Sequence, residues 1–237
     1  MCRPNVIIIG EGQTEHAALD GLLSAHLWER NLYPRFPVVG KTGGKKGGYK
    51  PFDLFVSQIR NFACQYPGAY ISTCFDYYKL NTTWPHVADI TNEKGGNAAA
   101  KADKIEEALT DRIYTEIGPD ILWKGHFFFY SQLHEFEALL FSNPDVLGEM
   151  LDPRTPGNNL QKAFRKINDD VGGDCEMIDD GPATAPSKRI EEAAHYKKGK
   201  SDKADAGPIL QEIGLPAIRQ ACRRFDEWVT RLETLTT

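Results

Sequence analysis

The stretch that decides the fold lies near the start of the chain and reads Val6-Ile7-Ile8-Ile9-Gly10-Glu11-Gly12-Gln13-Thr14-Glu15-His16. Its run of β-branched residues predicts a strand buried on both faces, because an unbroken apolar run leaves no face for water. Gly10 and Gly12 allow a sharp turn, and the Thr14 hydroxyl can cap the helix that follows. We therefore expect Glu11 at the carboxyl end of a central strand, where open parallel sheets bind ligands. A carboxylate on such a turn is either a metal ligand or a local cap.

The composition describes a chain that can build a large packed core. The sequence has 237 residues, of which 41% are hydrophobic, and a formal net charge of −5. This charge gives no global basic field, so any contact with nucleic acid must come from local patches. No apolar run approaches the roughly 20 residues that cross a bilayer. The first apolar stretch runs into Glu11 without a cleavage site, so we expect a strand there and not a signal peptide.

The cysteines carry no recognisable spacing. They are odd in number, scattered and without a C-x-x-C pair, and they comprise Cys2, Cys64, Cys74, Cys175 and Cys222. This pattern argues against a structural zinc site and favours a reducing cytoplasm. We expect each cysteine to be a free thiol that behaves as a small buried hydrophobe.

Strand and helix patterns alternate through the first part of the chain. Helical spacing predicts helices over 15–30, 52–64 and 98–117, and apolar runs predict strands over 6–9, 36–39, 69–75 and 125–131. This order predicts an α/β fold with a mainly parallel central sheet flanked by helices, because parallel strands need crossover connections. Asp76 directly follows the third strand. We therefore expect Glu11 and Asp76 at the same carboxyl edge of the sheet.

Proline and glycine become frequent after Asn143, and the pattern there is helical. Helices are predicted over 158–168 and at the end of the chain, where apolar residues keep helical spacing from Ile218 to Leu232. We expect residues 1–145 to form the α/β core. Residues 146–237 would form a helical C-terminal region packed on that core.

Acidic side chains follow several of the predicted strands. Glu11, Asp76, Glu135 and Glu137 are the candidate ligands for Mg²⁺ or Mn²⁺, since hard cations prefer carboxylate oxygens. Residues two apart point to opposite sides of a helix, so Glu135 and Glu137 could share a site only in an extended stretch. His134 is either a general base or a structural histidine. Glu15 lies inside a predicted helix, and we expect it to be solvated.

Basic side chains gather in two segments. Lys41, Lys45 and Lys46 lie in a glycine-rich loop, and Lys188, Arg189 and Lys198 lie in a basic run over 186–203. The Gly40-Lys41-Thr42 triplet is no phosphate loop, because Arg35 stands where the first glycine would be and four more glycines prevent a helix start. Each segment is either a solvated surface or a contact for a phosphate backbone. A polyanionic substrate requires them on the same side as the acids.

Three motifs together resemble a known family. They are Gly10-Glu11-Gly12-x-Thr14-Glu15, Asp76-Tyr77-Tyr78 and His134-Glu135-Phe136-Glu137-Ala138-Leu139-Leu140-Phe141. These motifs, with matching stretches up to the C-terminal helix, resemble a bacterial family of unknown function with a Toprim-like core. Genes of that family often stand beside an AAA-type ATPase, an arrangement similar to the overcoming-lysogenisation-defect nucleases and other phage-defence pairs.

The resemblance implies a function for the acids. By analogy with Toprim enzymes, Glu11 and Asp76 would hold Mg²⁺ for phosphodiester chemistry. Tyr78 occupies the place of a second aspartate, so Glu135 or Glu137 would have to complete the metal shell. The leading hypothesis is a cytoplasmic Mg²⁺-dependent nuclease acting on DNA or RNA with an AAA-type ATPase partner. The alternative is a non-catalytic binding or effector subunit of an ATPase-containing complex that keeps the fold.

Overall fold

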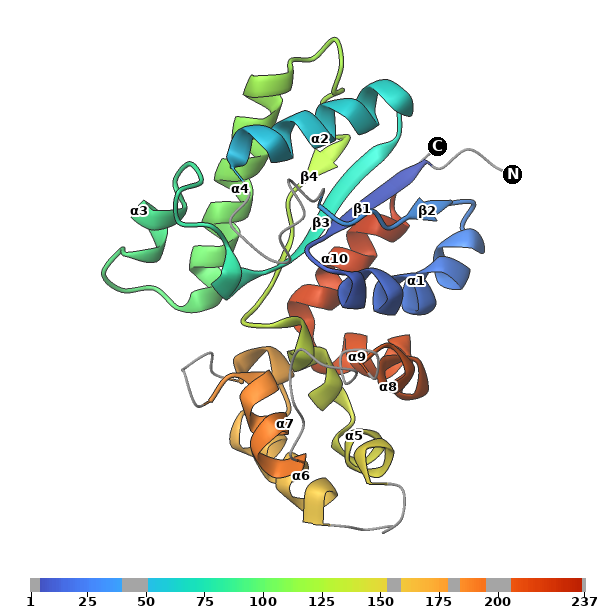
Figure 1. Ribbon diagram of the computed structural model, residues 1–237, viewed down its shortest axis with the longest axis vertical. Coiled ribbons are helices and arrows are strands. Elements are labelled where there is room, and N and C mark those ends of the chain that lie inside the picture. Colours follow the sequence, from blue (N-terminus) through green and yellow to red (C-terminus); the bar gives the residue numbers. More distant parts are fainter. Residues whose placement is uncertain (1–4, 40–50, 153–158, 179–183, 195–205, 236–237) are drawn as a thin grey trace. The chain divides into compact units, whose positions relative to one another are not determined.

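A computed structural model describes residues 5–39, 51–152, 159–178, 184–194 and 206–235. By its contacts the chain divides into two units (Figure 1). The sheet unit comprises Met1–His16, Leu27–Ser131 and Leu235–Thr237, and the helical unit comprises Ala17–His26 and Gln132–Thr234. The chain thus enters the helical unit for Ala17–His26 and again from Gln132. The division into domains at residue 145 stays a prediction.

The sheet unit is built on parallel strands. These are β1 (Val6–Gly10), β2 (Pro34–Arg35), β3 (Tyr70–Asp76) and β4 (Phe127–Phe128), in the order β2-β1-β3-β4. Each neighbouring pair runs parallel. The long apolar run of β1 is fully buried, because the strand is covered on both faces. The predicted α/β fold with a parallel central sheet is confirmed.

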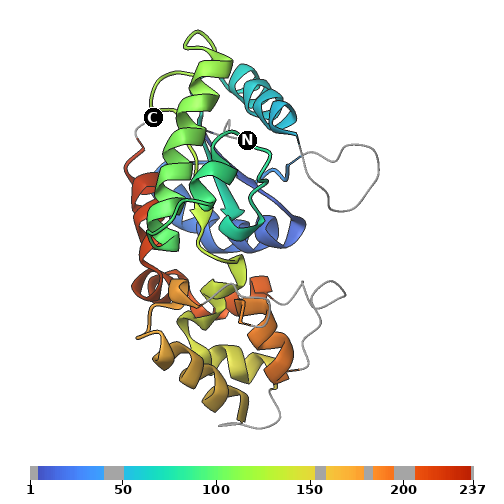
Figure 2. The ribbon, with the colours of Figure 1, turned by 90° about the vertical axis from the view of Figure 1, so that its left-hand side faces the viewer.

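Two helices of the sheet unit pack together beside the strands (Figures 1 and 2). They are α2 (Phe52–Gln65) and α4 (Ala98–Ile117), and the shorter elements η1 (Tyr77–Lys79) and α3 (Val87–Thr91) lie between them in sequence. The apolar stripe of α4 is buried as its spacing predicts, with Ile105 and Leu109 in one core with Ile7 and Phe55. Burial of this stripe fixes the helices against the sheet whose edge carries Glu11 and Asp76.

Two predicted strands are largely absent from the described sheet. The 36–39 prediction is wrong: β2 is Pro34–Arg35, and only Val38 forms an isolated bridge, with Gly10. Of the 125–131 prediction only β4 and β5 (Ser131–Gln132) form. Side-chain hydroxyls accept hydrogen bonds from backbone N–H groups of this segment. Phe129 N donates to Thr110 Oγ1 at 3.0 Å, and Tyr130 N donates to Thr73 Oγ1 at 2.8 Å.

Helix α1 (Gln13–Trp28) begins earlier than the sequence analysis expected. Its first residue is Gln13, so Thr14 lies within the first turn. The side chain of Thr14 lies outside the described part of the structure, so its capping role stays a prediction. The same shift places Glu15 in the first helical turn, next to the glycine turn that ends β1.

The helical unit is organised around a short 3₁₀ helix. This is η2 (Phe136–Ser142), and α5 (Pro144–Leu151), α6 (Asn159–Asp170), η3 (Cys175–Met177), α7 (Pro186–Ala194), α8 (Ala206–Ile213), α9 (Leu215–Ala221) and α10 (Arg223–Glu233) follow it. Five of its seven residues are buried. Helices α5, α6 and α7 lie near one another beside it (Figure 2). The segment therefore serves as the core of this unit.

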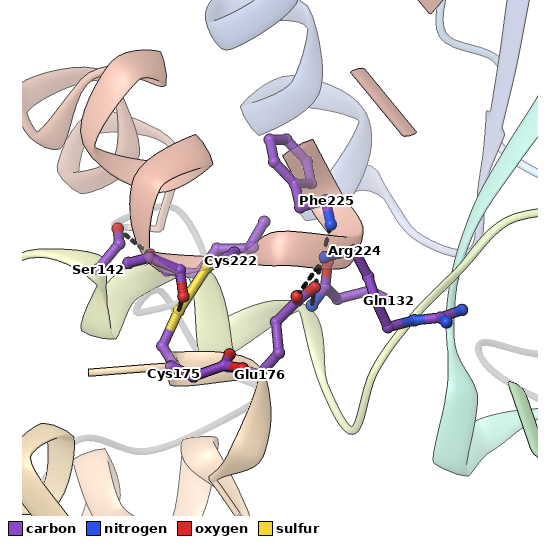
Figure 3. Close-up of a disulfide and its surroundings, with 10 residues drawn as sticks. Gln132, Ser142, Cys175, Glu176, Cys222, Arg224 and Phe225 are labelled. Carbon is purple, nitrogen blue, oxygen red and sulfur yellow. Dashed lines mark hydrogen bonds between the residues drawn. A yellow bond between two sulfur atoms is a disulfide. The ribbon is translucent and has the colours of Figure 1, made fainter. Parts of the chain in front are cut away.

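The cysteine prediction is wrong for two residues of the helical unit. Cys175 and Cys222 form a disulfide with a Cα–Cα distance of 5.9 Å, although they lie 47 residues apart (Figure 3). Spacing could not reveal this pair, because disulfide pairing depends on how distant segments meet. Cys74 is free and buried, as expected. Cys64 is free but exposed, so the expected burial is wrong for it, and Cys2 lies outside the described residues. The cysteines thus give no support to the expectation of a reducing compartment.

Within the described residues, no helix has both the length and the apolar composition needed to cross a membrane.

Candidate metal site at the carboxyl edge of the sheet

Glu11 and Asp76 meet at the ends of two paired strands. The register of β1 and β3 aligns Gly10 with Cys74, so the residues that follow them leave the sheet at the same edge. The backbone N–H of Asp76 donates to Glu11 Oε1 at 3.2 Å. Asp76 is only 3% exposed. The predicted meeting of these two acids, which are 65 residues apart in sequence, is confirmed.

The surroundings of Glu11 favour its protonated form. Burial, and then the charge of Asp76, raise the pKa of Glu11 from 4.5 to about 8. Glu15 adds to this rise, whereas Lys79 and the hydrogen bond from Asp76 oppose it. Glu11 therefore holds a proton at neutral pH in the absence of a cation.

A lysine balances the second acid. Lys79 lies on η1, three residues after Asp76, and its Nζ forms an ion pair with Asp76 Oδ2. The side chain of Lys79 is 33% exposed, so it links the buried carboxylate to the surface. The sequence analysis did not single out Lys79, although its spacing of three residues from Asp76 in a helical turn is a recognisable pairing distance.

Glu15 belongs to the site, contrary to the expectation that it would be solvated. Its Oε2 is buried and has no hydrogen-bond partner within the described residues. A Cβ atom added at Gly12 would lie 2.5 Å from this oxygen, so the glycine leaves room for it. The earlier start of α1 explains the difference, because it places Glu15 over the turn that Glu11 and Gly12 form.

The region behind the acids is also negative. The thiol of Cys74 is buried, and its pKa is raised by that burial and then by Asp76, Glu15, Glu11 and Glu106. Glu106 holds the backbone in place, since its Oε1 accepts from Ser131 N at 2.9 Å and from Ser131 Oγ at 2.8 Å. This carboxylate therefore has a structural role beside its contribution to the negative charge.

The donor set at this edge suits a hard cation. Mg²⁺ in proteins usually keeps several waters and takes one or two carboxylates. Glu11 and Asp76 would hold such an ion, and the unpartnered oxygen of Glu15 is a third donor of the same chemistry. Within the described ranges no group of three or more His, Cys, Asp or Glu side chains could hold a metal ion together. The fit therefore depends on the first two acids.

Glu135 lies in the helical unit and contacts the start of a helix. It is 1% exposed, and its Oε2 accepts from the backbone N–H of Ser187 at 2.8 Å. Ser187 is in the first turn of α7, where free N–H groups favour a negative partner. The contact stabilises the N-terminus of α7. A metal-binding role for Glu135 stays a prediction.

The other predicted residues of the helical unit gather around the same segment. His134 is buried, with a φ of 62°, and Glu137 is half-buried in η2. Lys188 pairs with Glu191 at 2.6 Å, and Arg189 Nε donates to the carbonyl oxygen of Thr184 at 2.9 Å. The predicted substrate contacts Lys41, Lys45, Lys46 and Lys198 lie outside the described residues.

Glu176 is a further buried carboxylate, in addition to Asp76 and Glu135, and the sequence analysis did not identify it. It lies beside the disulfide and accepts from Arg224 N at 2.6 Å, Phe225 N at 3.2 Å and Gln132 Nε2 at 3.1 Å (Figure 3). Burial raises its pKa. The first two contacts cap α10, so Glu176 has a structural role. Its place in an acidic stretch gave no signal of this burial.

Comparisons with known proteins place the chain in a family. None of the curated protein sequences matches it. The C-terminal region of the OLD protein of Xanthomonas campestris pv. campestris, in structures phased with mercury and with iodine, is similar to it at 16% and 14% identity. These matches cover 97% of this chain and 98% of that region, with TM-scores of 0.41 and 0.39. Residues 10–233 match a family described as a domain of unknown function, and the chain therefore belongs to the DUF4276 family.

Proposed function

We propose that the sheet unit is a Mg²⁺- or Mn²⁺-dependent nuclease that hydrolyses phosphodiester bonds of DNA or RNA. The observation that carries this proposal is the pairing of Glu11 with Asp76 at the carboxyl edge of parallel strands. Two carboxylic acids that are buried together repel one another once both are ionised. A divalent cation between them would remove that repulsion, and the raised pKa of Glu11 supports this reading.

The residues of the site would have different roles in binding the ion. A bound Mg²⁺ would supply Lewis-acid chemistry at a phosphodiester. Asp76 offers a buried oxygen, and Glu11 adds its own oxygen once it has lost its proton. Glu15 offers the oxygen that has no hydrogen-bond partner. Glu11 and Asp76 would hold the ion at one edge of the sheet, and Glu15 would add negative charge beside them.

The substrate and the partner follow from the resemblance of the motifs. A family with a Toprim-like core beside an AAA-type ATPase suggests nucleic acid as substrate and the ATPase as partner in phage defence. The net charge of −5 means that local cations must attract a polyanion. Lys79 at the site is such a cation, and Lys188 and Arg189 on α7 are further candidates.

Cleavage assays with matched variants test the proposal. Labelled single-stranded DNA, duplex DNA and RNA are incubated with Mn²⁺ and the purified protein, with and without the neighbouring ATPase. We expect cleavage that Asp76→Asn and Glu11→Gln abolish. Glu107→Gln, an exposed acid of α4, should retain it. Equal activity in wild type and Asp76→Asn on every substrate would contradict the proposal.

A second function has observations in its favour. Asp76 already has a cationic partner in Lys79, and Glu135 is engaged at the start of α7. Tyr78 is 42% exposed at the place of the second acid. These features suit a non-catalytic binding or effector subunit of an ATPase complex. Binding of the ATPase by both wild type and Asp76→Asn, without cleavage by either, would favour this function.

A further inference from the structure

We propose that Lys79 is an exchangeable counter-cation, which neutralises Asp76 without metal and moves to a substrate phosphate when a metal takes Asp76. The inference rests on the proposed function and deepens it by assigning a positioning residue. It begins from the ion pair between Lys79 Nζ and Asp76 Oδ2. One partner of this pair is buried and the other reaches the surface, with side-chain exposures of 3% and 33%.

The backbone of this segment is anchored by packing, whereas the charge of Lys79 lies at the end of a long side chain. Tyr77, the first residue of η1, packs against the core of the sheet unit. Lys79 ends the same short helix, so its Cα is held near the site. Its ammonium is a point charge on a flexible stem. The length of that stem would let the charge reach a second partner without a movement of the backbone.

The same ammonium also contacts an aromatic ring. The Nζ atom of Lys79 is 5.1 Å from the centroid of the Tyr78 ring, within the range of a cation–π contact. Tyr78 is 42% exposed, so this contact lies at the protein surface. An ammonium that leaves Asp76 can thus stay in contact with the ring.

Metal binding and the ion pair compete for the same oxygens. A divalent cation at Asp76 would repel the ammonium at short range. The released lysine would then pair with the nearest anion, and a phosphate of the substrate is the anion that lysine binds well as a point charge. Lys79 thereby keeps the site electrostatically balanced without metal and adds a positive charge toward the substrate with metal.

Chemical labelling of the wild-type protein tests the exchange directly. Sulfo-N-hydroxysuccinimide acetate acetylates accessible lysine amines, and mass spectrometry measures the extent at each position. We expect labelling of Lys79 to rise at least threefold when Mn²⁺ is added and to fall again with a non-hydrolysable phosphorothioate oligonucleotide. Lys124, an exposed lysine of the same unit, serves as the control and should not change. Equal labelling of Lys79 under all conditions would overturn the inference.

Binding measurements on variants provide the second test. Lys79→Met should bind Mn²⁺ about tenfold more tightly in calorimetry, and should bind the oligonucleotide with Mn²⁺ about tenfold more weakly. Lys79→Arg should restore oligonucleotide binding, because it keeps the charge. Lys124→Met shows the effect of losing one charge elsewhere. If Lys79→Met changes the affinities for Mn²⁺ and the oligonucleotide no more than Lys124→Met does, the inference fails while the proposed function stands. Absence of Mn²⁺ binding by wild type contradicts both.

Discussion

The backbone N–H of Asp76 donates a hydrogen bond of 3.2 Å to Glu11 Oε1, between the ends of two parallel strands. This contact ties the residue after β1 to the last residue of β3. It keeps the two acids in one site even without a cation.

The first prediction concerns pH. The pKa of Glu11 is raised from 4.5 to about 8, so the folded state holds a proton that the unfolded state loses between these values. Its contribution to stability is therefore complete below about pH 4.5 and is lost as pH rises toward 8, by at most roughly 1.4 kcal/mol per pH unit. Denaturation from pH 5 to 9 should show Glu11→Gln with a flatter profile than wild type.

A matched variant separates this effect from general acid titration. Glu107→Gln removes an exposed acid of α4 and should keep the wild-type slope. Identical slopes for Glu11→Gln and wild type would mean that Glu11 is not buried with Asp76 as described.

The second prediction concerns Mg²⁺. A ligand that binds only the folded state stabilises it by mass action, by about 2.7 kcal/mol at a hundredfold excess over the dissociation constant. Mg²⁺ should therefore raise the melting temperature of wild type. Asp76→Asn should respond weakly or not at all, and Glu15→Gln should respond less than wild type because Glu15 offers the unpartnered oxygen. Thermal melts over a Mg²⁺ titration make the comparison, and a full response from Asp76→Asn would rule out binding at this edge.

The third prediction separates the two roles discussed for Glu135. Glu135→Gln keeps an oxygen acceptor for Ser187 N–H, whereas Glu135→Ala leaves that buried donor unpaired. Loss of such a cap costs about 0.5–2 kcal/mol. Urea denaturation should therefore show Glu135→Ala as less stable and Glu135→Gln as close to wild type. If Glu135 also completes a metal shell, Glu135→Gln will lower Mn²⁺ affinity despite normal stability.

The fourth prediction concerns the disulfide. The Cys175–Cys222 disulfide closes a loop across 47 residues. A disulfide that closes such a loop typically raises the free energy of unfolding by about 2–4 kcal/mol. Cys222→Ser should lower the free energy of unfolding by about 2–4 kcal/mol. Dithiothreitol should lower the free energy of unfolding of wild type and leave that of Cys222→Ser unchanged. Cys64→Ser alters an exposed free thiol and serves as the control. Equal stability of wild type with and without reductant would contradict the pairing.

Local patterns and chain topology were enough to predict the meeting of Glu11 and Asp76. The apolar run before Glu11 and the strand before Asp76 are signals within the sequence itself. The rule that parallel strands share a carboxyl edge then brought the two acids together. The helix 98–117 was predicted for a similar reason, since a clear apolar stripe marks the face that it buries.

Features that depend on distant contacts could not be predicted. The 125–131 segment has strand-like residues, yet hydroxyls of Thr110 and Thr73 replace the sheet partners of its backbone. Glu176 and Cys175 are buried by the approach of the segment before α10, which no local spacing encodes. Glu15 was missed because a small shift in the start of α1 changes where its side chain lies.

Anomalous diffraction from crystals soaked in Mn²⁺ tests the central claim most directly. The account predicts one anomalous peak between Glu11 and Asp76, with carboxylate oxygens at about 2.1–2.2 Å, close to the distances of Mg²⁺ sites. It also predicts that Lys79 Nζ has left Asp76 in the soaked crystals. Absence of a peak at this edge, with the Lys79–Asp76 ion pair intact at saturating Mn²⁺, would contradict it.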